Sequence, residues 1–154
     1  MNPTIKIPVN PAVKKYLEIK LGKNYTLGTD DWFGIIVYNF LINKTNKHFK
    51  IIPKKYDKEI QFFEIILSSN QAEKAGIILT EKQEASINNI CYKIFKEELY
   101  SAAVVNKNLY SLDYMVTMNN LLDLYDITEE DLSYDALIKG FYRDRKAISE
   151  NMYL

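Results

Sequence analysis

The sequence has few of the residues on which catalytic and metal sites depend. Its 154 residues include one cysteine, Cys91, and one histidine, His48, and its five glycines are scattered. A single cysteine excludes a disulfide within the chain and suits a reducing compartment. The cysteine and histidine have none of the spacings of a zinc site, and scattered glycines do not make a phosphate-binding loop. We therefore expect a non-enzymatic protein without a metal or cofactor.

Long apolar runs are also missing. No stretch of the sequence is long enough to span a bilayer, and the first residues lack the apolar core of a signal peptide. The hydrophobic fraction of 47%, with 12 tyrosines and 7 phenylalanines, is nevertheless typical of a folded globular chain. We therefore expect a cytoplasmic location.

Charge is unevenly distributed along a chain that is neutral as a whole. Residues 1–58 hold 11 lysines against 4 acidic residues, a net charge of +7, and residues 59–154 carry −7. Such an asymmetry is typical of a surface that binds a polyanion, although lysines also protect the edge of a sheet from aggregation. The candidate phosphate contacts in this half are Lys44, Lys47, Lys50, Lys54, Lys55 and Lys58.

The N-terminal quarter predicts a strand followed by two helices. Apolar and polar side chains alternate over residues 4–9, which is the pattern of a strand with one apolar face. Asn10 and Pro11 are typical of a helix start, and Gly22 is typical of its end. We expect Thr29 to cap a second helix formed by the apolar run that follows.

The middle of the chain predicts the centre of the sheet. Residues 59–67 are apolar on both faces, which is typical of a central strand covered on both sides, and residues 49–52 predict a short strand. Residues 68–76 are rich in turn formers, and Thr80 with Gln83 has the spacing of a capping box that opens a long helix. The central strand precedes this connection and its covering helix follows it, so we expect no domain boundary there. The expected inner face of the helix carries Ile87, Ile90, Cys91, Ile94, Phe95 and Leu99.

The last third predicts two more helices. The first is expected between Ser111 and Tyr125, and the second begins at a capping-box-like pair, Thr128 and Asp131. With a short turn at residues 126–128, the pair has the outline of a helix-turn-helix. The second helix directs an apolar stripe inward: Tyr134, Leu137, Ile138, Phe141 and Ile148. Its opposite side carries Lys139, Tyr142, Arg143 and Lys146, and these residues together with Arg145 are further candidate nucleic-acid contacts.

The cationic face has an ordinary structural interpretation as well. A basic last turn complements the dipole of any amphipathic helix. Asp135 also lies four residues before Lys139, which is the spacing of a surface ion pair. Nucleic-acid binding and a solvated helix face therefore both remain open.

Residues 4–42 resemble the ribbon-helix-helix repressors. The strand TIKIPV and the helices NPAVKKYLEIKLG and TDDWFGIIVYNFLI follow one another in the order of that family. In these repressors two chains pair their strands into a ribbon that enters the major groove. The resemblance implies a homodimer with Thr4 and Lys6 directed at base edges, and a phosphate near Thr29.

A second resemblance extends over nearly the whole chain. The initial strand and helix, the turn GIIL at 76–79 and a patterned tail are similar to small, functionally unassigned proteins of phages and mobile elements of Bacteroidota. The residues of the tail pattern are Tyr125, Ile127, Leu137, Lys139, Phe141, Arg143 and Arg145. The resemblance implies an accessory protein in the cytoplasm of a bacterium or a phage-infected bacterium, and it implies no chemistry.

Taken together, these patterns predict an α+β protein, a single domain over residues 1–154, with a small, mostly antiparallel sheet covered by helices. Its basic half is residues 1–58 and its acidic, helical half is residues 59–154. The predicted function is that of a non-enzymatic DNA-binding or regulatory accessory protein. The alternative is a protein–protein interaction module, such as a phage inhibitor of a host system or a virion accessory protein, whose acidic half or exposed tyrosines contact a partner.

Overall fold

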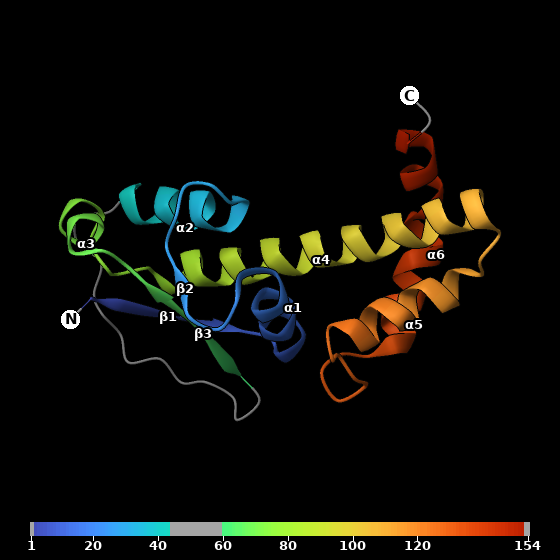
Figure 1. Cartoon of the computed structure of the whole chain (residues 1–154), viewed down its shortest axis with the longest axis horizontal. Helices are drawn as coiled ribbons and strands as arrows, with labels where there is room; N and C mark the ends of the chain where they lie inside the picture. Colours follow the sequence, from blue (N-terminus) through green and yellow to red (C-terminus); the bar gives the residue numbers. More distant parts are fainter. Residues whose placement is uncertain (1, 44–59, 153–154) are drawn as a thin grey trace. The chain divides into compact units, whose positions relative to one another are not determined.

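The computed structural model describes residues 2–43 and 60–152 and has an α+β fold with a small mixed sheet (Figure 1). The elements are β1 (Thr4–Val9), α1 (Pro11–Leu21), β2 (Tyr25–Thr26), α2 (Trp32–Ile42), β3 (Gln61–Ile66), α3 (Ser69–Ala75), α4 (Glu81–Tyr110), α5 (Tyr114–Leu124) and α6 (Tyr134–Met152). The chain divides into two compact units, Met1–Cys91 and Tyr92–Leu154, and α4 continues from the first into the second. The strand predicted at 49–52 lies outside the described residues.

The sheet belongs to the first unit and has the strand order β1–β3–β2. β3 is central, as predicted, and it pairs antiparallel with β1 and parallel with β2. The register places Ile7 opposite Phe63, and both side chains are buried. On the other face Phe62 is 37% exposed, so the prediction of a central strand buried on both sides is wrong for that face. The sheet has one core face because the alternating positions on β1 are not buried: Thr4 and Lys6 are exposed and Pro8 is half-buried.

The start of α1 differs in one respect from the prediction. The helix begins at Pro11 and ends at Gly22, whose φ of 85° suits glycine and whose N–H donates to the carbonyl oxygen of Glu18. The side chain of Asn10 makes no capping hydrogen bond. The backbone N–H of Asn10 instead donates to Oδ1 of Asn88 in α4, at 3.0 Å. The prediction that the Asn10 side chain caps the helix is therefore wrong, although the helix begins where predicted.

The N-cap of α2 is Asp31, not the predicted Thr29. Oδ1 of Asp31 accepts the backbone N–H of Gly34 at 2.7 Å, and the Tyr25 hydroxyl donates to the same carboxylate at 2.9 Å. The tyrosine therefore fixes the carboxylate in its capping position. Phe33 of this helix then packs edge-on against Phe63 of β3, with 5.5 Å between ring centroids.

The connection predicted at residues 68–76 contains a helix, α3. Ser68 and Gln71 form a full capping box, which allows a helix to start among turn-forming residues. The side-chain amide of Gln71 also donates to the carbonyl oxygen of Leu27 at 2.9 Å, which attaches α3 to the rest of the first unit. The whole connection lies within that unit.

The capping box predicted for the long helix is confirmed. The backbone N–H of Thr80 donates to Oε1 of Gln83 at 3.0 Å, and the N–H of Gln83 donates to Oγ1 of Thr80 at 3.1 Å. Four of the six expected inner residues are buried, namely Ile87, Cys91, Phe95 and Leu99, whereas Ile90 and Ile94 are half-buried. Helical spacing therefore identified the inward stripe of α4.

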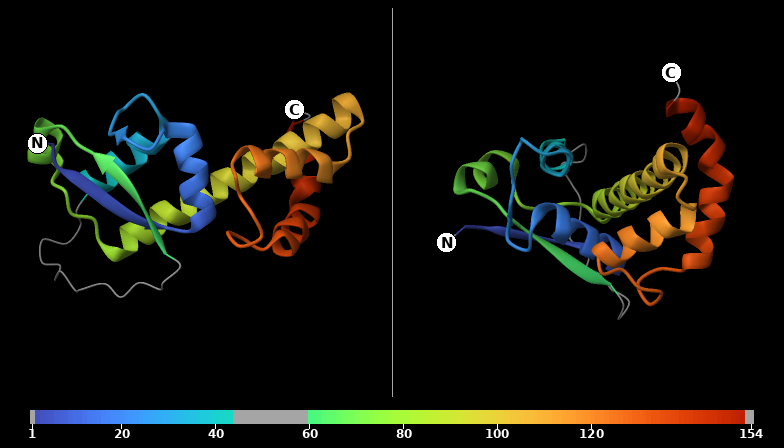
Figure 2. Two further views of the ribbon diagram at one scale, coloured as in Figure 1. Left: turned by 60° about the horizontal axis from the view of Figure 1, so that its bottom comes forward. Right: turned by 45° about the vertical axis from the view of Figure 1, so that its right-hand side comes forward.

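The second unit consists of the C-terminal part of α4 with α5 and α6 (Figures 1 and 2). α5 runs back beside α4, where Asn106 donates from its amide to Oγ1 of Thr117 at 3.1 Å. α6 crosses this hairpin, and the Tyr100 hydroxyl donates to the carbonyl oxygen of Leu137 at 2.8 Å. Phe141 is fully buried at the crossing, with its ring centroid 5.4 Å from that of Tyr100.

The last two helices begin later than predicted. Asp113 rather than Ser111 precedes α5, and Ser111 has a positive φ of 56° just after α4 ends. Asp131 does accept the backbone N–H of Thr128, at 2.8 Å, but the residues form a turn and no helix follows directly. α6 begins only at Tyr134, so the connection covers residues 125–133 instead of a short turn at 126–128. The hydrogen bond expected between Thr128 and Asp131 therefore forms, but it does not start a helix.

Candidate nucleic-acid interface

The outward face predicted for α6 is confirmed. Leu137 and Phe141 are buried in the core of the second unit, and Tyr134, Ile138 and Ile148 are half-buried. The candidate contact residues on the helix are all exposed: Lys139, Tyr142, Arg143, Arg145 and Lys146. The structure thus presents these five residues to solvent.

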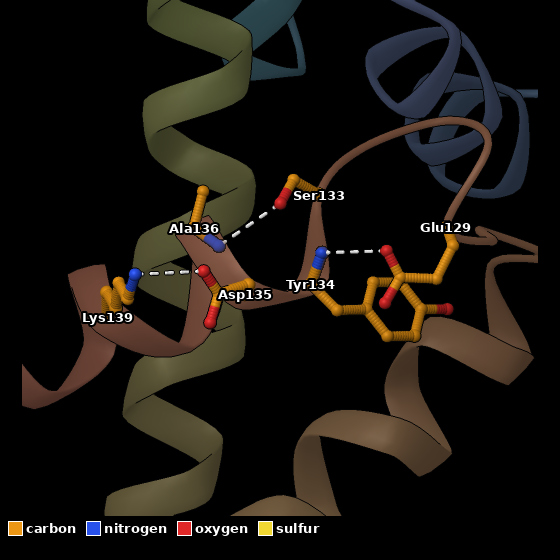
Figure 3. A network of polar contacts seen from close by, with 6 residues as sticks. All are labelled: Glu129, Ser133, Tyr134, Asp135, Ala136 and Lys139. Carbon is orange, nitrogen blue, oxygen red and sulfur yellow. Dashed lines mark hydrogen bonds and ion pairs between the residues drawn. The ribbon is translucent and has the colours of Figure 1, made fainter.

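Two of these cations form ion pairs within their own helix. Nζ of Lys139 lies 3.0 Å from Oδ2 of Asp135, one turn earlier, as Figure 3 shows. Nε of Arg143 donates to Oδ1 of Asp144 at 3.2 Å. Exposed pairs of this kind contribute little stability, because water already screens both charges. They do reduce the net charge that this part of the helix offers to a ligand.

Arg145 is held differently, by aromatic rings. Its guanidinium carbon lies 5.0 Å from the ring centroid of Tyr142 and 5.8 Å from that of Tyr114. Nζ of Lys107, at the end of α4, lies 5.7 Å from the centroid of the same Tyr114 ring. These are cation–π distances. We call Lys107, Tyr114, Tyr142 and Arg145 the cation–tyrosine cluster.

The cations of this cluster differ from Lys139 and Arg143 in their ion pairing. Among the described residues, no carboxylate lies within ion-pairing distance of Lys107, Arg145 or the adjacent Lys146. A guanidinium stacked on a ring keeps its N–H groups at the edge, where they can donate to an anion. The cluster therefore leaves positive charge and hydrogen-bond donors available on the surface.

The core of the second unit positions the cluster. Tyr114 opens α5 and packs on the buried Phe141, with 4.9 Å between ring centroids. Arg145 follows Phe141 by one turn of α6. Lys107 follows the buried Ala103 by one turn of α4, so the inward stripe of α4 ends in a cation. The cluster therefore lies where the apolar core gives way to solvent.

Sequence reasoning identified only half of this cluster. Tyr142 was found from helical periodicity and Arg145 was among the candidate contacts, whereas Lys107 and Tyr114 belong to other helices and were missed. One usable signal was present for Lys107, because a cation there occupies the apolar stripe of α4 at the spacing of Leu99 and Ala103. Tyr114 carried no comparable signal.

Of the candidates of the basic half, Lys6 lies within the described residues. Lys6 belongs to the first unit and is exposed on β1, with Glu64 of β3 as its register partner. β1 pairs with β3 of its own chain. The other candidates of this half lie outside the described residues: Lys44, Lys47, Lys50, Lys54, Lys55 and Lys58.

The other end of α6 is acidic, and its carboxylates are used locally. Oε2 of Glu129 accepts the backbone N–H of Tyr134 at 3.2 Å, and the hydroxyl of Ser133 accepts that of Ala136 at 3.3 Å (Figure 3). These bonds satisfy N–H groups at the start of the helix. Within residues 2–43 and 60–152, no group of three or more potential metal ligands gathers. The α5–α6 connection therefore serves helix capping in this structure.

Two buried ionisable side chains, those of Cys91 and Tyr100, have raised pKa values. Burial raises the pKa of the Cys91 thiol to about 12, so the thiol stays protonated near neutral pH and is a poor nucleophile. Burial likewise raises the pKa of Tyr100 to about 12, with further contributions from Tyr92 and Asp144 that Arg143 opposes. A small apolar pocket lies between α5 and α6 beside Leu122 and Leu137, with a volume of about 10 Å³, about the space of one water molecule. None of these features offers a substrate site.

In the part of the chain that is described, no helix combines the length and the apolar character needed to cross a membrane. Searches against family models, curated proteins and solved structures found no match to this chain.

Proposed function

We propose that this protein binds DNA without acting on it, through the cation–tyrosine cluster and the adjacent Lys146. The observation that supports this best is the absence of acidic partners for Lys107, Arg145 and Lys146 among the described residues. Cations without a local counter-charge attract phosphates, and release of the counterions that surround DNA then drives binding. Lys139 and Arg143 contribute less, because their own carboxylates compete with the phosphates.

The accessory role is part of the same proposal. Three cations support modest affinity, in the range of roughly 10⁻⁴ to 10⁻⁶ M that is typical of sequence-independent binding. A protein that binds in this way regulates or protects DNA by occupying it.

A pair of double variants tests the proposal. R145A with K146A removes two cations without partners, and K139A with R143A removes two cations that have ion-pair partners. Both variants change the net charge equally, so a difference between them reports the location of the binding surface. We expect the first to weaken binding by at least about tenfold and the second to have a smaller effect.

The readout is fluorescence anisotropy of labelled DNA at low salt and at about fourfold higher salt. We expect binding by the unaltered protein to weaken roughly 10- to 50-fold over that interval, as three phosphate contacts imply. Equal losses in the two variants would place the site elsewhere. The absence of binding at low salt would overturn the proposal.

A second candidate function is docking of a protein partner, and one observation favours it. The end of the α4–α5 hairpin exposes four aliphatic side chains: Val105, Leu109, Leu112 and Val116. Apolar side chains gathered on one exposed surface are typical of protein contacts. Such a surface predicts a protein complex that is less sensitive to salt than DNA binding, so the titration above separates the two candidates.

A further inference from the structure

We infer that the DNA bound at the cation–tyrosine cluster is single-stranded, with a base stacked on an exposed tyrosine ring. This inference rests on the proposed function. It concerns the form of the nucleic acid and adds a role for the rings, whereas the proposed function requires only the cations. Its starting observation is that Lys107 and Arg145, two of the cations of the proposed binding surface, lie against aromatic side chains.

The exposure of the rings supports stacking. Tyr142 is 48% exposed although Arg145 lies against its ring, and Tyr110, at the end of α4, is 69% exposed. Tyr110 follows Lys107 by three residues, which places the two side chains side by side on the helix surface. Exposed rings beside cations are the combination with which proteins hold single strands: the cations contact phosphates and the bases stack on the rings.

The charge along α6 argues against docking of a duplex. A helix that reads the major groove directs its N-terminal residues at the bases and passes between two phosphate backbones. The N-terminal end of α6 carries Asp135 and follows Glu129, Glu130 and Asp131, and phosphates would repel these carboxylates. Arg145 and Lys146 lie in the C-terminal half of the helix, and Arg145 is close to Tyr114 at the start of α5. A flexible single strand can contact this half of the helix alone.

Bases in a duplex are also unavailable to these rings. They are stacked on one another and paired, so a ring on the protein surface reaches them only after they unstack, which costs free energy. A single strand presents the faces of its bases directly. Stacking tolerates any sequence, so we expect affinity for single strands with little sequence preference.

The test compares one labelled oligonucleotide in its single-stranded form and annealed to its complement, by anisotropy at low salt. We expect tighter binding of the single strand. Y142A should weaken single-strand binding about 5- to 100-fold, and Y142F, which keeps the ring, should bind nearly as the unaltered protein does. Y110A is the second ring variant. Because the Tyr110 side chain is highly exposed, we expect this variant to fold as the unaltered protein does.

Each outcome decides between the claims. Equal or tighter binding of the duplex overturns the single-strand inference and leaves the proposed function standing. A loss in Y142F as large as that in Y142A overturns the stacking role. No binding of either form overturns both claims. Circular dichroism of each variant confirms that the comparison is made between folded proteins.

Discussion

Phe141 connects the core of the second unit with its surface cluster. Its side chain is fully buried, its ring meets those of Tyr100 and Tyr114, and Arg145 follows one turn later. Tyr114 in turn holds the cations of the cluster. A single core residue therefore orients groups that come from three helices.

Replacing Phe141 with alanine should destabilise the protein strongly. F141A leaves a cavity where the ring was and should lower the free energy of unfolding by about 3–5 kcal/mol. Urea denaturation followed by circular dichroism measures the change. L124A on α5 is the matched control, because Leu124 is 62% exposed, and its effect should stay within about 0.5 kcal/mol. A loss in F141A no larger than in L124A would contradict the buried assignment.

At the scale of the element, the start of α2 depends on a side chain of the preceding strand, β2. Asp31 caps the helix, and the hydroxyl of Tyr25 donates to both of its carboxylate oxygens at 2.9 Å. Space is tight there, since a Cβ at Gly34 would overlap the carbonyl oxygen of Gly28. Thr29, two residues before the cap, is exposed.

Two single variants distinguish the cap found here from the one expected. D31A removes the capping bond and leaves the Tyr25 hydroxyl without its carboxylate acceptor, so we expect a loss of about 2–3 kcal/mol in unfolding free energy. T29A should change it by no more than about 0.5 kcal/mol. The same urea denaturation measures both. A larger loss in T29A than in D31A would restore Thr29 as the cap.

The elements that could be predicted from the sequence carry their signals locally. Alternation over residues 4–9, the Pro11 and Gly22 boundaries and the capping box at Thr80 each lie within a few residues of the structure they produce. The start of α2 could not be predicted in the same way, because the choice between Thr29 and Asp31 depends on the position of Tyr25.

The candidate site follows the same division. The outward face of α6 could be predicted, because helical periodicity separates it from Phe141 and Leu137. The sequence did not predict which of its cations form ion pairs, and it did not predict that Lys107 and Tyr114 contribute to the cluster. Both features depend on how α4, α5 and α6 pack together, and no pattern within a single helix encodes that packing.

At the scale of the whole chain, the neutral total conceals two separations of charge. Residues 1–58 carry +7 and residues 59–154 carry −7. Within the acidic half, residues 129–135 around the start of α6 carry four carboxylates and no cation, whereas Arg145 and Lys146 farther along the helix have no ion-pair partner among the described residues. Net charge alone therefore does not predict what this chain binds. The decisive feature is which charges lack a partner nearby.

Alkaline pH should destabilise the folded chain, because the groups with shifted pKa values all shift upward. Burial is the largest cause for each: the pKa values of Tyr25, Tyr92 and Tyr100 rise above 10.0 and that of Cys91 rises above 9.0. The folded state therefore keeps protons that the unfolded chain releases. Stability is complete below the ordinary pKa values and falls as the pH rises toward about 12, the pKa of Tyr100 and of Cys91 in the folded chain.

Urea midpoints from about pH 8 to about pH 11 measure this loss. We expect the midpoint to fall progressively over that range. Y100F is the matched variant, because it removes one titrating hydroxyl together with its hydrogen bond to the carbonyl oxygen of Leu137. It should be less stable than the unaltered protein near neutral pH and should lose less on going to alkaline pH. A midpoint that stays constant or rises would mean that these groups are as accessible to water in the folded chain as in the unfolded one.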